Sequence, residues 1–158
     1  MNDHSALLDT FYRAFQARDG AAMAACYHPG GKFSDPVFPD LSAREAGAMW
    51  QMLCRRGKDL RVEYRILSAN AQHGQVRWEA WYTFSASGRP VHNQIDASFE
   101  FRDGKIFRHR DDFDFPRWAA QALGFKGWLL GRTRFLQGSV QKSAAKSLNA
   151  SMARAETE

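Results

Sequence analysis

EFRDGKIFRHRDDFD, residues 100–114, is the stretch that decides the fold. Its Asp103-Gly104 dipeptide supplies the positive φ angles that a tight hairpin turn requires. Apolar and polar residues alternate on both sides of this dipeptide, which is the pattern of a β-strand with one buried face. The stretch therefore predicts two antiparallel strands joined by a two-residue turn.

One face of the second strand of this hairpin holds two side chains that can act as acids, bases or ligands. By the two-residue period, His109 and Asp111 share a face with Phe107 and Phe113. If this face lines a cavity, it combines an apolar wall with convergent polar groups, which is the usual make-up of a small-molecule site. His109 and Asp111 are therefore candidate functional residues.

The whole chain has the size and composition of one folded domain. It holds 158 residues, of which 44% are hydrophobic, enough for a single buried core. It has no apolar run of the roughly 18 to 20 residues that a membrane-spanning helix needs, and its first residues do not resemble an export signal. Cys26 and Cys54 predict no disulfide framework. We therefore expect a cytoplasmic protein.

The positive charge of the chain is confined to its C-terminal part. Residues 116–158 hold seven of the 22 Lys and Arg residues and two of the 17 Asp and Glu residues, so they account for the whole net charge of +5. The body of the protein is balanced, and nucleic-acid binding, which requires a basic face on the domain, is not expected. We divide the chain into a domain over residues 1–123 and a basic, amphipathic extension over residues 124–158.

The first 57 residues predict three helices interrupted by one short strand. Spacings of three and four between apolar residues indicate a helix before Asp19-Gly20, and a second one from Gly20 to about Tyr27. A strand over residues 32–34 then ends at Asp35, which precedes a proline and is therefore extended. Ser42-Ala43-Arg44-Glu45 is a capping box, and it predicts the start of a helix that ends near Gly57.

From Leu60 onward the pattern becomes alternating, which predicts a run of long antiparallel strands. The run from Arg89 to Phe101 is long enough that we expect it to curve or to contain a bulge. Helices followed by antiparallel strands give an α+β fold, in which the helices pack on one face of a curved sheet and close it into a cone. The inward face of the last strand and Asp35 would line the interior of this cone.

The order of these elements resembles the nuclear transport factor 2-like superfamily and, within it, the SnoaL-like group. The likeness covers residues 5–115. It is carried by four segments, LLDTFYRAFQARDGAAM, KFSDPVF, SAREAGAMW and FRDGKIFRHRDDFD. This resemblance implies an α+β cone with an apolar internal pocket and a homodimer that forms through the outer face of the sheet.

Two enzymes of the superfamily provide candidate roles. Asp35-Pro36-Val37 is similar to the segment that holds the general base of ketosteroid isomerase. The oxyanion-hole tyrosine of that enzyme falls at Phe11, one residue from Tyr12, and its protonated aspartate falls at Ala97. The segment from His109 to Asp114 is similar to the last strand of limonene epoxide hydrolase, which implies that Asp111 is a general acid or base.

We therefore expect Asp35, Asp111 and His109 to be catalytic, in a site without a metal or another cofactor. The substrate would be a small, apolar organic molecule, and the reaction an isomerisation, cyclisation, dehydration or epoxide hydrolysis. Its binding wall is expected to comprise Tyr12, Phe33, Trp50, Phe99 and Phe113.

The same residues have ordinary structural explanations, and these stay open. An aspartate before proline often caps a turn, Asp111 could form an ion pair with Arg108 or Arg110, and His109 could be a core histidine. The alternative function is a ligand-binding or interaction module without catalysis, in which side chains fill the pocket.

The extension is expected to pack on the body or on a partner subunit. Its glycines make one continuous helix over residues 125–146 improbable, and we expect Trp128, Leu129 and Phe135 to make the contact. Contact with a membrane surface is the less favoured alternative. From about Ser147 the small, polar residues predict a fraying end.

Overall fold

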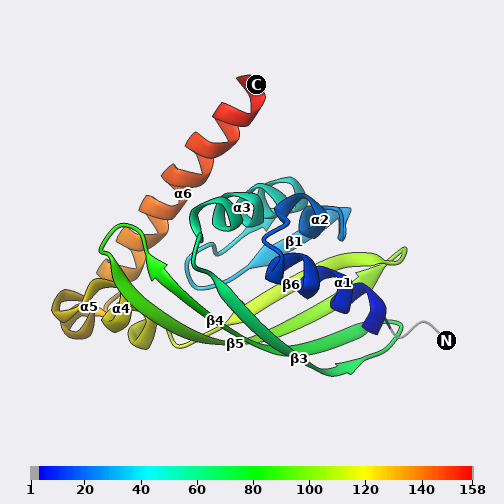
Figure 1. Cartoon of the computed structure of the whole chain (residues 1–158), viewed down its shortest axis with the longest axis horizontal. Coiled ribbons are helices and arrows are strands. Elements are labelled where there is room, and N and C mark those ends of the chain that lie inside the picture. The colour runs from blue at the N-terminus through cyan, green and yellow to red at the C-terminus, as the bar shows by residue number, and fades with distance from the viewer. Residues whose placement is uncertain (1–3, 158) are drawn as a thin grey trace.

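The computed structural model describes residues 4–157 and contains one curved sheet of six strands, shown in Figure 1. The strand order is β2-β1-β6-β5-β4-β3, so β2 and β3 form the edges and the sheet is not closed. All neighbouring strands are antiparallel except β1 and β6, which run parallel. The strands are β1 (Tyr27–Ser34), β2 (Leu41–Ser42), β3 (Arg61–Ala69), β4 (His73–Phe84), β5 (Arg89–Arg102) and β6 (Lys105–Asp112).

The hairpin between β5 and β6 forms as its sequence predicts. Asp103 and Gly104 have φ angles of 52° and 73°, the left-handed values that this turn needs. The register of the pair shifts where Glu100 faces Arg108 and Phe101 faces Ile106, so the extra residue is Phe107 and the bulge lies in β6, not in β5 where the sequence predicts it. The α+β cone is confirmed.

The N-terminal helices α1 (Ser5–Gln16), α2 (Gly20–Ala24) and α3 (Ala43–Arg56) cover the concave face of the sheet (Figure 1). Helix α3 begins with the predicted capping box, in which the Ser42 side chain accepts from the Glu45 backbone and the Glu45 side chain accepts from Ser42. The buried side chains of α1 and α3 meet the inner residues of β1, β4, β5 and β6 in one apolar cluster.

The prediction for Tyr27 was wrong. Helix α2 ends at Ala24, and Tyr27 is the first residue of β1, where it pairs with Ile106. The apolar spacing of residues 23–27 also fits a strand that enters the core, and the pairing with β6 decides in favour of the strand. The Tyr27 side chain is thereby placed in the interior.

Three further helices follow the sheet, namely α4 (Phe115–Leu123), α5 (Phe125–Leu130) and α6 (Arg134–Thr157). A break around Gly131 separates α5 from α6, so the expected interruption occurs. The expected fraying from Ser147 does not, because α6 continues to Thr157. Leu148 is 2% exposed and belongs to the main apolar cluster, since α6 packs along α3.

The expected contacts of the extension with the body are made by other side chains than those predicted. Trp128, Leu129 and Phe135 are exposed, whereas Leu136 is buried with α4 in a second apolar cluster. Trp128 and Leu129 are at the surface because α5 packs against α4 with its other side, which carries Gly127. Within residues 4–157, no helix has the length and apolar character needed to cross a membrane.

Candidate functional site

The inner face of β6 holds two polar side chains in the interior. His109 is 2% exposed and Asp111 is 3% exposed, and in residues 4–157 they are the buried side chains outside the hydrophobic set. Ordinary cores exclude such groups unless hydrogen bonds compensate for the loss of water. The hydrogen-bond partners of His109 and Asp111 therefore show how the interior accommodates two polar side chains.

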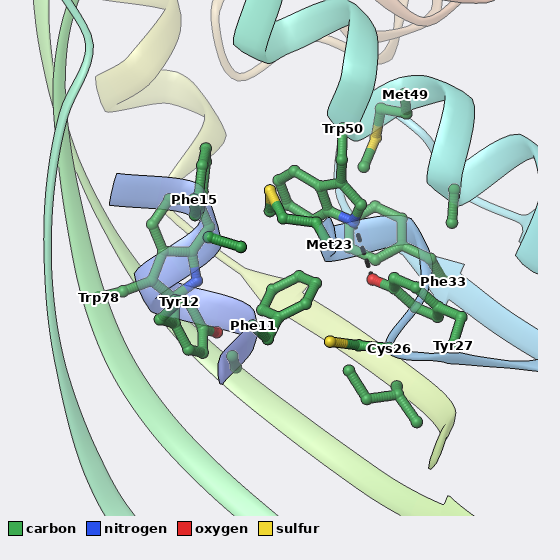
Figure 2. Packing of buried hydrophobic residues seen from close by; sticks show 14 of the residues in the cluster. Phe11, Tyr12, Phe15, Met23, Cys26, Tyr27, Phe33, Met49, Trp50 and Trp78 are labelled. Atoms are coloured by element: carbon green, nitrogen blue, oxygen red, sulfur yellow. Dashed lines mark hydrogen bonds between the residues drawn. The ribbon is translucent and has the colours of Figure 1, made fainter. Parts of the chain in front are cut away.

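His109 and Asp111 belong to a chain of hydrogen bonds. The Trp50 indole donates to the Tyr27 hydroxyl at 2.8 Å, the bond drawn in Figure 2, and Tyr27 lies 2.8 Å from Nδ1 of His109. On the other side of the ring, Nε2 of His109 lies 2.8 Å from Oδ1 of Asp111. The Trp78 indole donates to the same oxygen at 3.4 Å. We call these five side chains the buried relay.

When the imidazole of His109 is neutral, the numbers of donors and acceptors in the relay determine where each proton lies. An indole N–H only donates, so the Tyr27 oxygen accepts from Trp50 and its own O–H is donated to Nδ1 of His109. The proton of the imidazole then resides on Nε2 and is donated to Asp111. Both ring nitrogens are occupied, so His109 orients Asp111 and has no nitrogen left for a ligand.

Aromatic rings surround His109 on every element that faces it. Phe99 lies 4.1 Å and Phe33 4.9 Å from its ring centroid, Phe11 lies 5.7 Å away, and Trp50 is stacked at 6.1 Å. Figure 2 shows Phe11, Phe33 and Trp50 converging on this region from α1, β1 and α3. The predicted wall residues Phe33, Trp50 and Phe99 are thus brought together, in contact with the relay.

Tyr12 contributes an unused hydroxyl to this interior. Its side chain is 0% exposed and stacks on Tyr64 at 5.0 Å, but its oxygen has no hydrogen-bond partner within the described residues. Burial raises the pKa of Tyr12, and the charge of Asp111 raises it further, so the hydroxyl stays protonated near Asp111. A buried donor without a partner is rare and suits a ligand oxygen.

Asp35 lies beside Asp111 at the end of β1. Phe33 pairs with His109 and Ser34 with Arg110, so Asp35 follows the last paired residue of β1 and lies near enough to Asp111 for that charge to affect it. Oδ1 of Asp35 accepts from the backbone N–H groups of Val37 at 2.7 Å and Phe38 at 2.6 Å. The carboxylate therefore also makes the turn contact that its place before proline allows.

The surroundings of Asp35 raise its pKa to near neutral pH. Its side chain is half-buried, and burial raises its pKa from 3.8 to about 7. The bond from Phe38 acts against this rise, while the negative charge of Asp111 adds to it. A carboxyl with a pKa near 7 is populated in both of its protonation states at neutral pH, so Asp35 can exchange a proton there.

The C-terminal extension covers the Asp35 end of the interior. The Gln137 and Gln141 side chains both donate to the carbonyl oxygen of Pro36, at 3.1 and 3.0 Å. The Trp118 indole donates to the hydroxyl of Tyr82, whose pKa is raised by burial and by the charge of Asp35. Helices α4 and α6 are therefore next to the predicted site, and the half-buried Phe113 leads from β6 into α4.

Two hollows open at the surface, away from the two carboxylates. One of about 680 Å³ is bordered by residues of α2 and α3 such as Gln51 and Cys54. The other, of about 430 Å³, lies between α3 and α6 and reaches Tyr27. Neither is lined by Asp35, His109 or Asp111. Aromatic side chains pack around His109, and the second hollow touches the relay at Tyr27.

Sequence reasoning missed two members of the relay. The sequence predicts Tyr27 at the end of a helix, and Trp78 is not among the predicted site residues. The alternation of β4 does contain the signal for Trp78, because it puts this residue on the same face as Val76 and Ala80. Nothing in the sequence pairs Tyr27 with His109, since 82 positions separate them.

Comparisons with known proteins agree with this architecture. The sequence model of the SnoaL-like domain family matches residues 8–109. No curated protein matches by sequence. Among solved structures, a candidate polyketide cyclase from Xanthomonas campestris pv. campestris has a TM-score of 0.62 at 21% identity, with 75% of this chain and 95% of that chain covered.

Two further structures share the fold at lower identity. An LEH-like epoxide hydrolase of M. tuberculosis has a TM-score of 0.58 at 19% identity, with 84% of this chain and 94% of that chain covered. A protein of ketosteroid isomerase-like fold from Catenulispora acidiphila, in complex with trimethylamine, has a TM-score of 0.64 at 11% identity, with 75% and 92% covered. The chain belongs to the SnoaL-like domain family.

Proposed function

We propose that the protein is a cofactor-independent enzyme that performs acid–base chemistry on a small, largely apolar organic molecule. The observation that carries this proposal is the pairing of Asp35, whose pKa is raised to about 7, with Asp111, which the buried relay holds in place. A group with a pKa near the working pH is the most effective proton carrier, because both of its states are populated.

Each side chain takes a distinct part in this proposal. Asp35 removes a proton from the substrate and returns it at another atom or to a leaving oxygen. Burial raises the pKa of Asp35 and the nearby Asp111 adds to the rise, while His109 is a positioning residue that orients Asp111. Tyr12 donates its free hydroxyl to a substrate oxygen that gains negative charge.

Several reactions fit a proton carrier beside a hydroxyl donor. Isomerisation, cyclisation, dehydration and epoxide opening each need a proton moved and a negatively charged oxygen stabilised. The names of the similar structures, a candidate polyketide cyclase and an epoxide hydrolase, belong to the same group of chemistries. Phe33, Trp50, Phe99 and Phe113 would provide the apolar contacts.

The test is turnover of an unconjugated enone, an alicyclic epoxide and a linear polyketone, followed by substitution. On the probe that is turned over, Asp35→Asn and Asp111→Asn should each lower kcat by about 10²- to 10⁴-fold. Asp112→Asn is the matched control, because Asp112 is the next residue on β6 and points to the exposed face. Near-normal turnover by both inner-face variants would refute the proposal.

A second candidate is a ligand-binding or dimeric interaction module without catalysis, and the close packing of aromatic rings around His109 supports it. Neither of the two hollows is lined by Asp35 or Asp111. On the outer face of the sheet, Trp81 stacks on His92 at 4.6 Å and lies under Arg61. Light scattering tests the homodimer, which should have twice the 18.0 kDa mass of one chain. Ligand binding that survives Asp35→Asn without turnover of any probe would support this candidate.

A further inference from the structure

Large apolar side chains gather at the surface where α5 meets α6. Phe125 is 74%, Trp128 70%, Leu129 59% and Phe135 78% exposed, and these four account for all but one of the exposed large hydrophobic residues within residues 4–157. The rings of Phe125 and Trp128 stack at 5.9 Å. We call these four residues, with Lys126, Arg132 and Arg134 beside them in sequence, the α5–α6 tip.

Helix α5 presents these residues outward because its opposite side is occupied by close backbone contacts. A Cβ atom added to Gly127 would lie 1.9 Å from the carbonyl oxygen of Ala119 in α4. At Gly131 it would lie 3.1 Å from Cα of Pro116. Glycine at both positions lets α5 approach α4 closely. The side of α5 that carries Gly127 is therefore buried, and the side that carries the large apolar residues is exposed. This is the reverse of an ordinary amphipathic helix.

The exposure is costly unless the tip has a partner. Phe125, Trp128 and Leu129 stand at i, i+3 and i+4 of α5 and therefore share one face of it, and Phe135 is the second residue of α6. Exposed apolar patches on soluble domains mark contacts with a protein or a membrane. Figure 1 places α4 and α5 at one end of the molecule, away from the N-terminus, so the tip projects from the body.

The charges around the tip decide between these partners. Lys126, Arg132 and Arg134 are exposed, and the sequence has no Asp or Glu between Phe115 and Ala155. Two copies that met tip to tip would bring these cations together, which opposes self-association. Cations flanking a projecting set of Trp, Phe and Leu side chains suit an interface that is negative outside and apolar below.

We propose that the α5–α6 tip binds the surface of anionic phospholipid membranes. The apolar side chains of the tip, Phe125, Trp128, Leu129 and Phe135, enter the boundary between headgroups and acyl chains. Lys126, Arg132 and Arg134 contact the lipid phosphates and carboxylates. Apolar insertion by four side chains and attraction by three cations are each weak, and together they give reversible binding. The inference does not depend on the acid–base proposal.

Vesicle flotation of the full chain tests the inference. The protein should float with phosphatidylcholine vesicles that contain about 30% phosphatidylserine, and salt should weaken the binding because the charges act through the surface potential. The variant Trp128→Ser with Phe135→Ser should bind at least about tenfold more weakly. Both residues are exposed, so the fold should be unchanged, and circular dichroism checks this.

A pair of charge variants supplies the matched comparison. Arg132→Glu with Arg134→Glu removes cations at the tip, whereas Lys142→Glu with Lys146→Glu makes the same change in net charge farther along α6. The first should weaken binding at least about tenfold more than the second. Equal effects, or no flotation of the wild-type chain, would overturn the proposal. So would a dimer that the Trp128 and Phe135 substitutions dissociate, since the tip would then be a self-association surface.

Discussion

The interior around His109 and the surface of α5 depart from the usual rule of burial in opposite directions. At the first, a histidine and an aspartate lie inside among aromatic rings. At the second, aromatic residues lie outside among cations. Each arrangement costs free energy in isolation, by loss of water around a polar group or by exposure of apolar area.

The two regions differ in how this cost is offset. The relay satisfies its own groups, since Tyr27 and Trp78 provide hydrogen bonds to His109 and Asp111, and only the Tyr12 hydroxyl stays without a partner in the described residues. The α5–α6 tip has no such compensation within residues 4–157. The comparison indicates that the relay contributes to the stability of the fold, whereas the tip acts through something outside it.

The largest effect is expected from removing one partner of the relay. Asp111→Ala leaves Nε2 of His109 and the Trp78 indole without their shared acceptor in a place that excludes water. Each buried donor left without an acceptor costs about 1 to 3 kcal/mol, and the cavity left by the removed side chain adds to this. Urea denaturation should therefore give a free energy of unfolding that is lower by about 3 to 5 kcal/mol.

The control for this experiment is Asp112→Ala on the same strand. Asp112 pairs with Arg110 at 3.3 Å, and both side chains are mostly exposed, so its loss should cost less than about 0.5 kcal/mol. Similar losses for the two variants would mean that the relay is no more important than a surface ion pair, and the contrast between the two regions would fail.

A second prediction concerns pH. The pKa of Asp35 is raised from 3.8 to about 7, so between these values the folded protein keeps a proton that the unfolded chain releases. Stability from this group is therefore full below about pH 4 and is lost as pH rises to about 7, by at most about 4 kcal/mol.

Urea denaturation from pH 4 to pH 8 measures this loss. Asp35→Asn keeps an acceptor for Val37 and Phe38 but does not ionise, so it should gain stability relative to wild type as pH rises. Asp40 is exposed and lies in the same loop. The free energy of unfolding of Asp40→Asn should therefore change with pH as that of wild type does. If the free energies of unfolding of Asp35→Asn and wild type differed by the same amount at every pH from 4 to 8, Asp35 would not be the group with the raised pKa.

Sequence patterns predicted the sheet and the main site residues for identifiable reasons. Asp103-Gly104 and the capping box at Ser42 are local signals, in which a few neighbouring residues determine the backbone. Strand period correctly puts His109 and Asp111 on the inward face of β6, but it also puts Phe107 there, and the bulge at Phe107 brings Ile106 into the core instead. Asp35, His109 and Asp111 were therefore placed on the correct elements, and their catalytic roles stay predictions.

What the sequence could not provide depends on contacts between distant segments. Tyr27 joins the relay because β1 lies parallel to β6, which no local pattern encodes. Leu148 is buried because α6 passes along α3, although its neighbours are small and polar. In α5, the approach of Gly127 to Ala119 reverses the face that hydrophobicity alone would bury.

The smallest predicted effects compare two apolar residues of α6. Leu148 is 2% exposed against α3, and Leu148→Ala should lower the free energy of unfolding by about 2 kcal/mol or more, because it removes buried methyl groups and leaves a cavity. Phe135 is larger but 78% exposed, and Phe135→Ala should change stability by less than about 0.5 kcal/mol. If Phe135→Ala proved the more destabilising, the tip would pack on the body after all and would have no free surface for a membrane. If neither variant changed stability, α6 would contribute little to the fold, contrary to the burial of Leu148.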